Sequence, residues 1–305
     1  MSFPSGSRTI LFGGSGFLGP HILRLAPEMI SVGRRPPRGG LLNRHIPIAA
    51  LSDLSALKEV DFDRVVYIIG NTNHKALEKP DLLPSEPTAF DYHVAPLLQT
   101  LEQLKQRPIR QFIHFSSILV YDETRLTFPV PESAPLSPYK SRYALSKFLA
   151  EEAAKYYARW MPVTALRLAN LYGPSDIERW DIVHTISREL IARGAANMWT
   201  VKPARDFIHV SDAARALLSL LDADVTGVNT FNLGSGVMTS LARIRELLEQ
   251  ASGAQITVAD QPVTGPMGFQ CDISALQAAT GWAPRVAVEE GIPATYRDLK
   301  ALWSA

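Results

Sequence analysis

A tyrosine and a lysine four residues apart form the first pair in this sequence that could move a proton. Side chains at the spacing of Tyr143 and Lys147 share one face of a helix. A phenol ionises at about pH 10, so it is a poor acid or base at neutral pH. A nearby ammonium stabilises the phenolate, and we therefore expect Lys147 to lower the pKa of Tyr143. Ser117 could hold the reacting oxygen, although the Tyr–Lys pair alone is equally typical of a half-buried core tyrosine.

A glycine-rich turn follows the first apolar run of the chain. Gly13, Gly16 and Gly19 satisfy the pattern G-x-x-G-x-x-G, and Gly14 with the last two satisfies G-x-G-x-x-G. Residues without a Cβ allow a tight turn that a pyrophosphate can approach, and the next helix offers free N–H groups to the anion. The position after a strand predicts a dinucleotide site rather than an ordinary glycine-rich turn. The expected contacts are Gly13, Gly16, Phe17, Leu18 and Gly19.

The segment after the second apolar run bears on the choice of cofactor. NAD-binding proteins of this type carry an acidic residue there, which holds a ribose hydroxyl. The segment Ser31–Pro36 contains no Asp or Glu, whereas Arg34 and Arg35 offer planar cations suited to a 2′-phosphate. This favours NADP, while NAD stays open because both arginines could instead be solvated loop residues.

Alternating strands and helices must hold these residues in place. Short uninterrupted apolar runs suit strands that are buried on both faces of a parallel sheet. Such runs lie at residues 9–12, 29–32, 64–69, 110–116 and 163–168, and helices are expected at 17–25, 96–105 and 138–160. Ser137 and Pro138 would begin the last helix. The pattern predicts an α/β fold, a Rossmann-type doubly wound parallel sheet.

The character of the sequence changes after Leu171, where Pro and Gly become frequent and helices more scattered. We therefore expect an NAD(P)-binding domain over residues 1–170, to which 205–235 return. A smaller C-terminal α/β region over residues 171–305 would bind the substrate.

Composition argues against several other classes of protein. Lysine and arginine total 31 against 30 acidic residues, so the net charge of +1 gives no basic face for nucleic acid. The lone Cys271 excludes an internal disulfide and a multi-cysteine metal site, and His184 has no second ligand at metal spacing. No apolar run reaches the roughly 18 residues that span a bilayer, and the first residues lack a signal-peptide pattern. We expect a cytoplasmic protein that binds no metal, membrane or nucleic acid.

The order of motifs over nearly the whole chain resembles that of the extended short-chain dehydrogenase/reductases, the NAD-dependent epimerase/dehydratase group. The glycine turn, the Ser-x-x-Val-Tyr run that begins at Ser117 and the Tyr-x-x-x-Lys pair are similar to three signatures of this family. Later segments are similar to further signatures. These are Arg167–Pro174, Arg205–Asp212, Phe231–Gly236, Thr280–Pro284 and Glu289–Gly291.

The resemblance implies roles for individual residues. Ser117, Tyr143 and Lys147 would be the catalytic triad, with Tyr143 as general acid or base and Lys147 also binding the nicotinamide ribose. Family members usually act on nucleotide sugars, so Asn170 and Arg205 become candidates for the substrate diphosphate. Pairing of long helices into a homodimer is common in the family, and the long helix of this chain could serve.

Several positions depart from the family pattern. Asp53 lies near the place of a family Asp and Gly70 at that of a small Ala pair, so both are expected at the cofactor. His93 replaces an Asn. Ile118, directly after Ser117, carries no proton to exchange, unlike the Asp-Glu of sugar 4,6-dehydratases, and it occupies the Cys position of fucose-type epimerase–reductases.

Three functions follow from these observations. We expect NADPH-dependent reduction of a keto-sugar, because the arginines favour a cofactor that is exchanged in each cycle. The alternatives are a nucleotide-sugar 4-epimerase with bound NAD and, from another class, a non-catalytic NAD(P)-binding sensor or scaffold. Residues 257–272 contain no Arg or Lys to clamp a nucleotide phosphate. Either Arg205 suffices or the substrate is not an ordinary nucleotide sugar.

Overall fold

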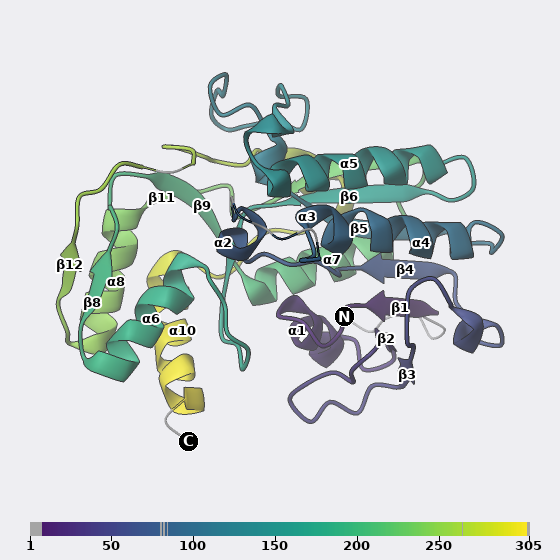
Figure 1. Cartoon of the computed structure of the whole chain (residues 1–305), viewed down its shortest axis with the longest axis horizontal. Helices are drawn as coiled ribbons and strands as arrows, with labels where there is room; N and C mark the ends of the chain where they lie inside the picture. The colour runs from purple at the N-terminus through teal and green to yellow at the C-terminus, as the bar shows by residue number, and fades with distance from the viewer. Residues whose placement is uncertain (1–7, 80, 82, 84, 264, 304–305) are drawn as a thin grey trace.

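The computed structural model describes residues 8–79, 81, 83, 85–263 and 265–303, and its centre is a seven-stranded parallel sheet (Figure 1). In spatial order the strands are β10 (Val228–Leu233), β6 (Val163–Leu168), β5 (Gln111–Ser117), β4 (Arg64–Tyr67), β1 (Thr9–Phe12), β2 (Ile30–Gly33) and β3 (His45–Pro47). The chain starts in the middle of the sheet, adds strands outward to β3 and then crosses back to build the other half. This reversal puts the turn after β1 beside the turn after β4.

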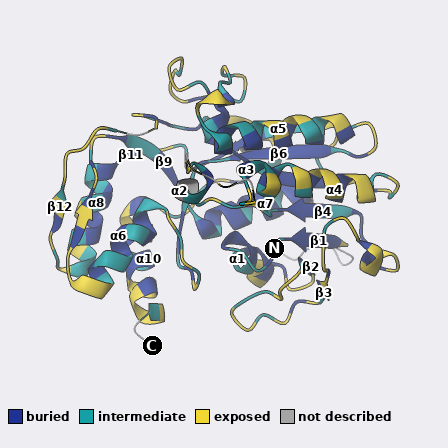
Figure 2. Ribbon diagram, viewed as in Figure 1, coloured by how far each residue is buried: buried dark blue, intermediate teal, exposed yellow. Residues whose placement is uncertain are grey.

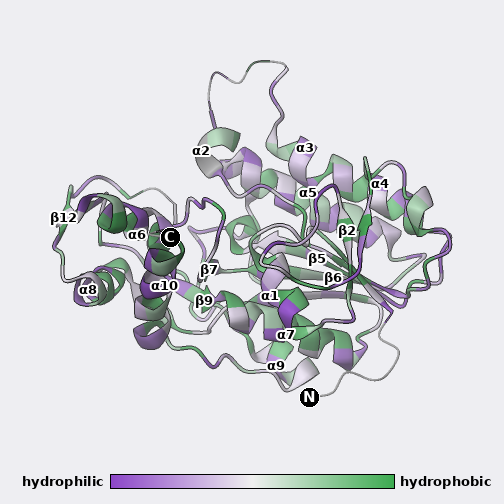
Figure 3. Ribbon diagram, turned by 90° about the horizontal axis from the view of Figure 1, so that it is seen from below, coloured by the Kyte–Doolittle hydropathy of each residue, from purple (hydrophilic) through white to green (hydrophobic). Residues whose placement is uncertain are grey.

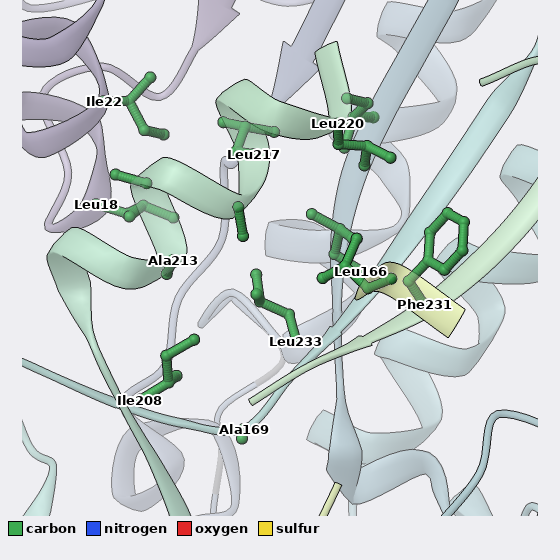
Figure 4. Packing of buried hydrophobic residues seen from close by; sticks show 14 of the residues in the cluster. Leu18, Ile22, Leu166, Ala169, Ile208, Ala213, Leu217, Leu220, Phe231 and Leu233 are labelled. Atoms are coloured by element: carbon green, nitrogen blue, oxygen red, sulfur yellow. The ribbon is translucent and has the colours of Figure 1, made fainter. Parts of the chain in front are cut away.

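Helices cover both faces of this sheet (Figure 3). One face carries α1 (Leu18–Leu25), α7 (Val210–Ala223) and α9 (Ser274–Thr280); the other carries α3 (Ala89–His93), α4 (Ala95–Leu104) and α5 (Arg142–Tyr157). Successive strand residues point to opposite faces, so Leu11 packs in the core with α1 and α7, whereas Ile10 packs in the core with α4 and α5. Figure 4 shows the first core, where Ile22 and Leu217 face each other. The predicted doubly wound α/β fold is confirmed.

A second group of elements lies beyond the carboxyl ends of the strands (Figure 1). It contains a three-stranded sheet, a two-stranded sheet and three helices around a core of their own. These elements are β7 (Asn170–Tyr172), β9 (Ala204–His209), β11 (Met238–Ser240), β8 (Ala196–Met198), β12 (Ile256–Val258), α6 (Ile182–Arg193), α8 (Leu241–Ser252) and α10 (Val288–Trp303). β10 and α7, although late in the sequence, pack with the large sheet.

The start of the long helix and the edge of the large sheet differ from the sequence-based prediction. The long helix begins at Arg142, because the Ser141 side chain accepts a hydrogen bond from the amide of Ala144 and caps the helix there. Residues Pro138–Lys140 form a separate 3₁₀ turn. The short edge strand β3 was not predicted, because only its central Ile46 is buried and so no apolar run marks it.

Most of the large sheet is buried, and exposed residues concentrate on the outer faces of the helices and in loops (Figure 2). No helix in the described part of the chain is both long and apolar enough to cross a membrane. The prediction about a signal peptide concerns residues 1–7, which lie outside the described residues.

Candidate active site

The turn between β1 and α1 has a backbone that side chains would disrupt. Gly13 has a φ of +96°, a conformation that L side chains rarely adopt, and its carbonyl accepts a hydrogen bond from the amide of Gly16 at 3.0 Å. A Cβ on Gly19 would lie 2.4 Å from the carbonyl oxygen of Gly14. The pattern of glycines is therefore explained by a tight turn and by close packing of α1 on that turn.

The N-terminus of α1 suits an anion. Phe17 occupies the N-cap position without a side-chain cap, and no acidic residue lies in the first turn. The first amide groups of a helix lack partners within the helix, and they carry a partial positive charge. The turn and the helix end thus fit the pyrophosphate of a dinucleotide.

Ser117, Tyr143 and Lys147 come together where β5 ends against α5. All three side chains are buried. A hydrogen bond joins the hydroxyls of Ser117 and Tyr143, and the Lys147 ammonium donates to the Phe115 carbonyl oxygen at 3.0 Å. The Lys147 nitrogen lies 5.8 Å from the centre of the Tyr143 ring. A phenol, a hydroxyl and a cation therefore share one site. Together these groups could transfer a proton to an oxygen atom.

Burial governs the protonation of this group. It raises the pKa of Tyr143 to about 12, against the opposing effects of the Ser117 hydrogen bond and of the Arg179 charge. Burial also lowers the pKa of Lys147 to about 8, against the charge of Glu151. The expectation that Lys147 lowers the pKa of Tyr143 is not met, because burial dominates and the ammonium is directed to the Phe115 carbonyl instead.

Arg179 is a cation near this group that the sequence did not reveal. Its guanidinium lies 3.6 Å from the centre of the Phe17 ring in the glycine turn, and its Nε donates to Asp181 at 2.8 Å. The segment that carries Arg179 also contacts α1 through Pro174, whose carbonyl lies 3.1 Å from a ring nitrogen of His21. A single arginine in a loop has no sequence pattern that predicts a role. The only local indication is that Arg179 follows the segment Tyr172–Pro174 at the end of β7.

The predicted substrate residues lie in the second group of elements. The Asn170 amide donates to the Asp206 carbonyl at 2.8 Å and ties β7 to β9. The Nε of Arg205 donates to the Pro266 carbonyl at 3.2 Å, and burial lowers the pKa of Arg205. Trp199, which is 60% exposed, is held by a hydrogen bond from its indole to the Pro262 carbonyl. The carbonyls of Pro262 and Pro266 thus hold the side chains of Trp199 and Arg205.

The remaining predicted cofactor residues differ in their surroundings. Arg34 and Arg35 are exposed immediately after β2. Asp53 is exposed as well, and its carboxylate accepts a hydrogen bond from the Ser55 amide at 2.9 Å, so its visible role is to form the turn before the 3₁₀ helix η1 (Ser55–Leu57).

Gly70, in contrast, borders the Ser117–Tyr143–Lys147 group. A Cβ at this position would lie 3.4 Å from the Lys147 nitrogen and 3.1 Å from the His93 ring. A side chain here would press on both residues. The described residues contain no group of three or more His, Cys, Asp or Glu that could hold a metal ion.

Comparison with known proteins identifies the family. A model of the NAD dependent epimerase/dehydratase family matches residues 9–234. The chain belongs to this family. The match runs from β1 through β10 and so includes the glycine turn, the Ser–Tyr–Lys group and both predicted substrate residues.

Relatives within the epimerase/dehydratase family carry several enzyme names. GDP-L-fucose synthase 1 of Arabidopsis thaliana is 29% identical over 195 residues, which cover 55% of this chain and 57% of that protein. The aligned part thus spans less than two thirds of that relative. UDP-glucuronic acid decarboxylase 5 of the same plant is 25% identical over 325 residues, covering 97% of this chain and 90% of the relative.

Solved structures of epimerases share the fold. UDP-glucose 4-epimerase of Thermotoga maritima, determined with UDP-glucose, has a TM-score of 0.84 at 21% identity and covers 97% of this chain and 99% of its own. UDP-glucuronic acid 4-epimerase of Bacillus cereus, determined with UDP-glucuronic acid and NAD, has a TM-score of 0.81 at 21% identity over 96% and 99%. The predicted resemblance to the epimerase/dehydratase family is confirmed.

Proposed function

We propose that this chain is an NADPH-dependent oxidoreductase that reduces a keto-sugar, most simply one linked to a nucleotide. The observation that carries the proposal is the meeting of Ser117, Tyr143 and Lys147 at the end of β5, beside the turn that leads from β4 and next to the glycine turn. The exposed Arg34 and Arg35 support NADP, because they take the place of the acidic residue that an NAD ribose would need.

The residues of the chain divide the work of reduction. The nicotinamide, when bound, supplies the hydride to the carbonyl carbon. Ser117 donates a hydrogen bond to the carbonyl oxygen and holds it beside Tyr143. Tyr143 gives its proton to that oxygen as the alcohol forms, and solvent returns a proton to the phenolate. The Lys147 ammonium would bind the nicotinamide ribose.

Residues of the second group of elements would hold the rest of the substrate. We propose that Arg205 binds the diphosphate by paired N–H groups, with Asn170 beside it on the neighbouring strand. Support comes from the adjacent parallel strands β7 and β9, in which the partner of Asn170 is Phe207, two residues after Arg205. The names of the relatives support a nucleotide sugar, because they include UDP- and GDP-sugar enzymes.

A 4-epimerase is the second candidate. It is favoured by the UDP-glucose and UDP-glucuronic acid epimerases that share the fold along almost their whole length. Such an enzyme would use the same three residues, with oxidation and re-reduction on opposite faces of the sugar. Ile118, buried directly after Ser117, argues against 4,6-dehydration and against the fucose synthase reaction, because it offers neither an acid nor a thiol.

An assay of cofactor consumption separates the candidates. The protein is incubated with NADPH or NADH and a panel of UDP-, GDP- and dTDP-linked sugars and keto-sugars, and absorbance at the nicotinamide band is followed together with product. Net loss of NADPH supports reduction. Conversion of a nucleotide sugar with tightly bound NAD and no net loss supports epimerisation and contradicts the reductase.

Ligand-dependent thermal stability tests the non-catalytic alternative. A ligand at 100 times its Kd adds about 2.7 kcal/mol to the free energy of unfolding. If NADP stabilises the protein, but no nucleotide sugar stabilises it or is turned over, the result would favour a sensor and overturn the enzyme proposal.

The exposed end of α5 is our candidate for a homodimer contact. Tyr156 is 54% exposed and packs against Trp160 at a ring-centre distance of 5.8 Å, whereas Tyr157 points into the core. Tyr156→Glu should leave a monomer in sedimentation experiments if this face pairs.

A further inference from the structure

A buried histidine lies between the turn after β4 and the catalytic helix. His93, the last residue of α3, is 2% exposed. Its ring and the Tyr143 ring form a T-shaped contact with a centre-to-centre distance of 5.3 Å and an angle of 88°. The same ring packs beside Gly70, which itself borders the Lys147 ammonium. The imidazole therefore contacts the surroundings of both residues that would handle the proton.

The two ring nitrogens connect two separate segments. Nδ1 lies 2.8 Å from the hydroxyl of Ser146 on α5, and Nε2 lies 3.1 Å from the amide nitrogen and 3.0 Å from the carbonyl oxygen of Asn71. The Ser146 hydroxyl in turn lies 2.8 Å from the carbonyl oxygen of Tyr143. A continuous path of hydrogen bonds can thus run from the turn after β4 to the backbone of the catalytic tyrosine.

Donor counting selects the direction of this path. If Nδ1 carries the proton, Nδ1–H donates to Ser146, Ser146 donates to the Tyr143 carbonyl and the Asn71 amide donates to Nε2, which gives three hydrogen bonds. If Nε2 carries it, the ring donates to the Asn71 carbonyl and Ser146 donates to Nδ1, which gives two. We assign the first tautomer, because it satisfies more of the buried polar groups.

We propose that His93 is a positioning residue: through the Asn71–His93–Ser146 path it fixes the turn at Gly70 relative to the backbone of Tyr143. This inference rests on the proposed function for its effect on turnover, but not for the hydrogen-bond path itself. Gly70 and Tyr143 lie on different segments, 73 positions apart in the sequence, so no short stretch of chain sets their separation. The imidazole connects the two segments through its hydrogen bonds. A reaction geometry held within fractions of an ångström depends on such constraints.

The tautomer is measured directly, without substrate. Nitrogen-15 NMR of histidine-labelled protein should show a protonated Nδ1 and an accepting Nε2 for His93, the signal being assigned by its absence from His93→Phe. Ser146→Ala, which removes the acceptor of Nδ1–H, should shift that signal, whereas Ser187→Ala, a buried helix serine outside the path, should not. A protonated Nε2, or no response to Ser146→Ala, would overturn the path.

Kinetics tests the positioning role. His93→Phe keeps an aromatic ring against Tyr143 but removes both hydrogen bonds, and it should lower kcat about tenfold with KM changed less than about twofold, because one hydrogen bond is worth about that factor. His93→Gln, which can still accept from Asn71, should recover part of the loss. The Ser146→Ala/His93→Phe double variant should be no slower than His93→Phe alone, since both break one path.

The outcomes separate this proposal from the function itself. Wild-type kcat in a folded His93→Phe, or additive losses in the double variant, overturns the positioning role while leaving the oxidoreductase intact. If the wild type turns over no substrate, the proposed function fails, and the NMR result still decides whether the hydrogen-bond path exists.

Discussion

The Ser117–Tyr143–Lys147 group and the exposed tryptophans near the second group of elements differ in how firmly the protein holds them. Ser117, Tyr143 and Lys147 are each 6% exposed and are fixed by hydrogen bonds to one another or to the backbone of β5. In the second group of elements Trp199 is 60% exposed and Trp180 45% exposed. Buried groups on a strand and a helix give a preorganised site, whereas exposed groups on loops can change without loss of the fold.

The residues around Ser117, Tyr143 and Lys147 are also buried and firmly held. Glu151, one helical turn after Lys147, is completely buried and accepts two hydrogen bonds from Arg167 at 3.0 and 2.8 Å. Arg167 also donates to the Glu132 carbonyl and lies over the Tyr121 ring. Around the exposed tryptophans the contacts are a hydrogen bond from the Trp199 indole to the Pro262 carbonyl and the Arg188 guanidinium, 5.2 Å from the centre of the Trp180 ring. The residues that we propose for the chemistry therefore lie in the core, whereas the exposed side chains lie at its margin.

The largest effect is expected from removing the phenol. Tyr143→Phe keeps the ring that packs near Leu77 and His93 but removes the proton that would be transferred, so kcat should fall by about 10²–10⁴-fold. Tyr156→Phe, an exposed tyrosine of the same helix, is the control. Cofactor binding, measured by thermal shift, should persist in both variants. Turnover retained in Tyr143→Phe would mean that the buried group is a packing group only.

The next effect concerns the buried ion pair. Glu151→Ala leaves the Arg167 guanidinium without its carboxylate in a site that water cannot reach, which should cost about 3–5 kcal/mol of unfolding free energy in denaturant titrations. Glu152→Ala, which breaks an exposed pair with Lys155, should cost less than about 1 kcal/mol. Equal losses of unfolding free energy in the two variants would contradict the view that the buried pair is held more firmly than the exposed one.

Arg205→Ala tests the second group of elements. Hydrogen bonds to charged groups are worth about 1.5–3 kcal/mol, so the KM for a nucleotide sugar should rise about 10–100-fold with little change in kcat. Lys202→Ala, an exposed cation on the neighbouring loop, should leave KM unchanged. A loss confined to kcat would place Arg205 with the chemistry instead.

The smallest effect is a pH dependence that arises from Lys147. Its pKa is lowered by burial from 10.5 to about 8, so turnover that needs the ammonium should fall about tenfold per pH unit above that value. Between pH 8 and 10.5 the unfolded chain binds more protons than the folded one, so this group makes stability rise with pH. Lys147→Met should abolish its contribution to that rise. A denaturant series that shows the same slope in both proteins would show that Lys147 titrates normally.

The sequence determined the features that depend on near neighbours along the chain. Gly13 and Gly19 predicted a turn that tolerates no Cβ. The run from Phe112 to Phe115 predicted a strand buried on both faces. The spacing of Tyr143 and Lys147 predicted that they share a helix face, because residues four positions apart lie on the same side of a helix. The family signatures are made of these same local units, so the sequence also indicated the family.

Only the tertiary structure decided what depends on distant segments. It brought Arg179 onto Phe17 and His93 between Asn71 and Ser146, and neither contact has a signature in spacing or composition. It also reversed the expected direction of the pKa of Tyr143, since spacing shows that a cation is near but not how deeply the phenol is buried. Burial is a sum over contacts from the whole fold, and for that reason only the folded chain sets it.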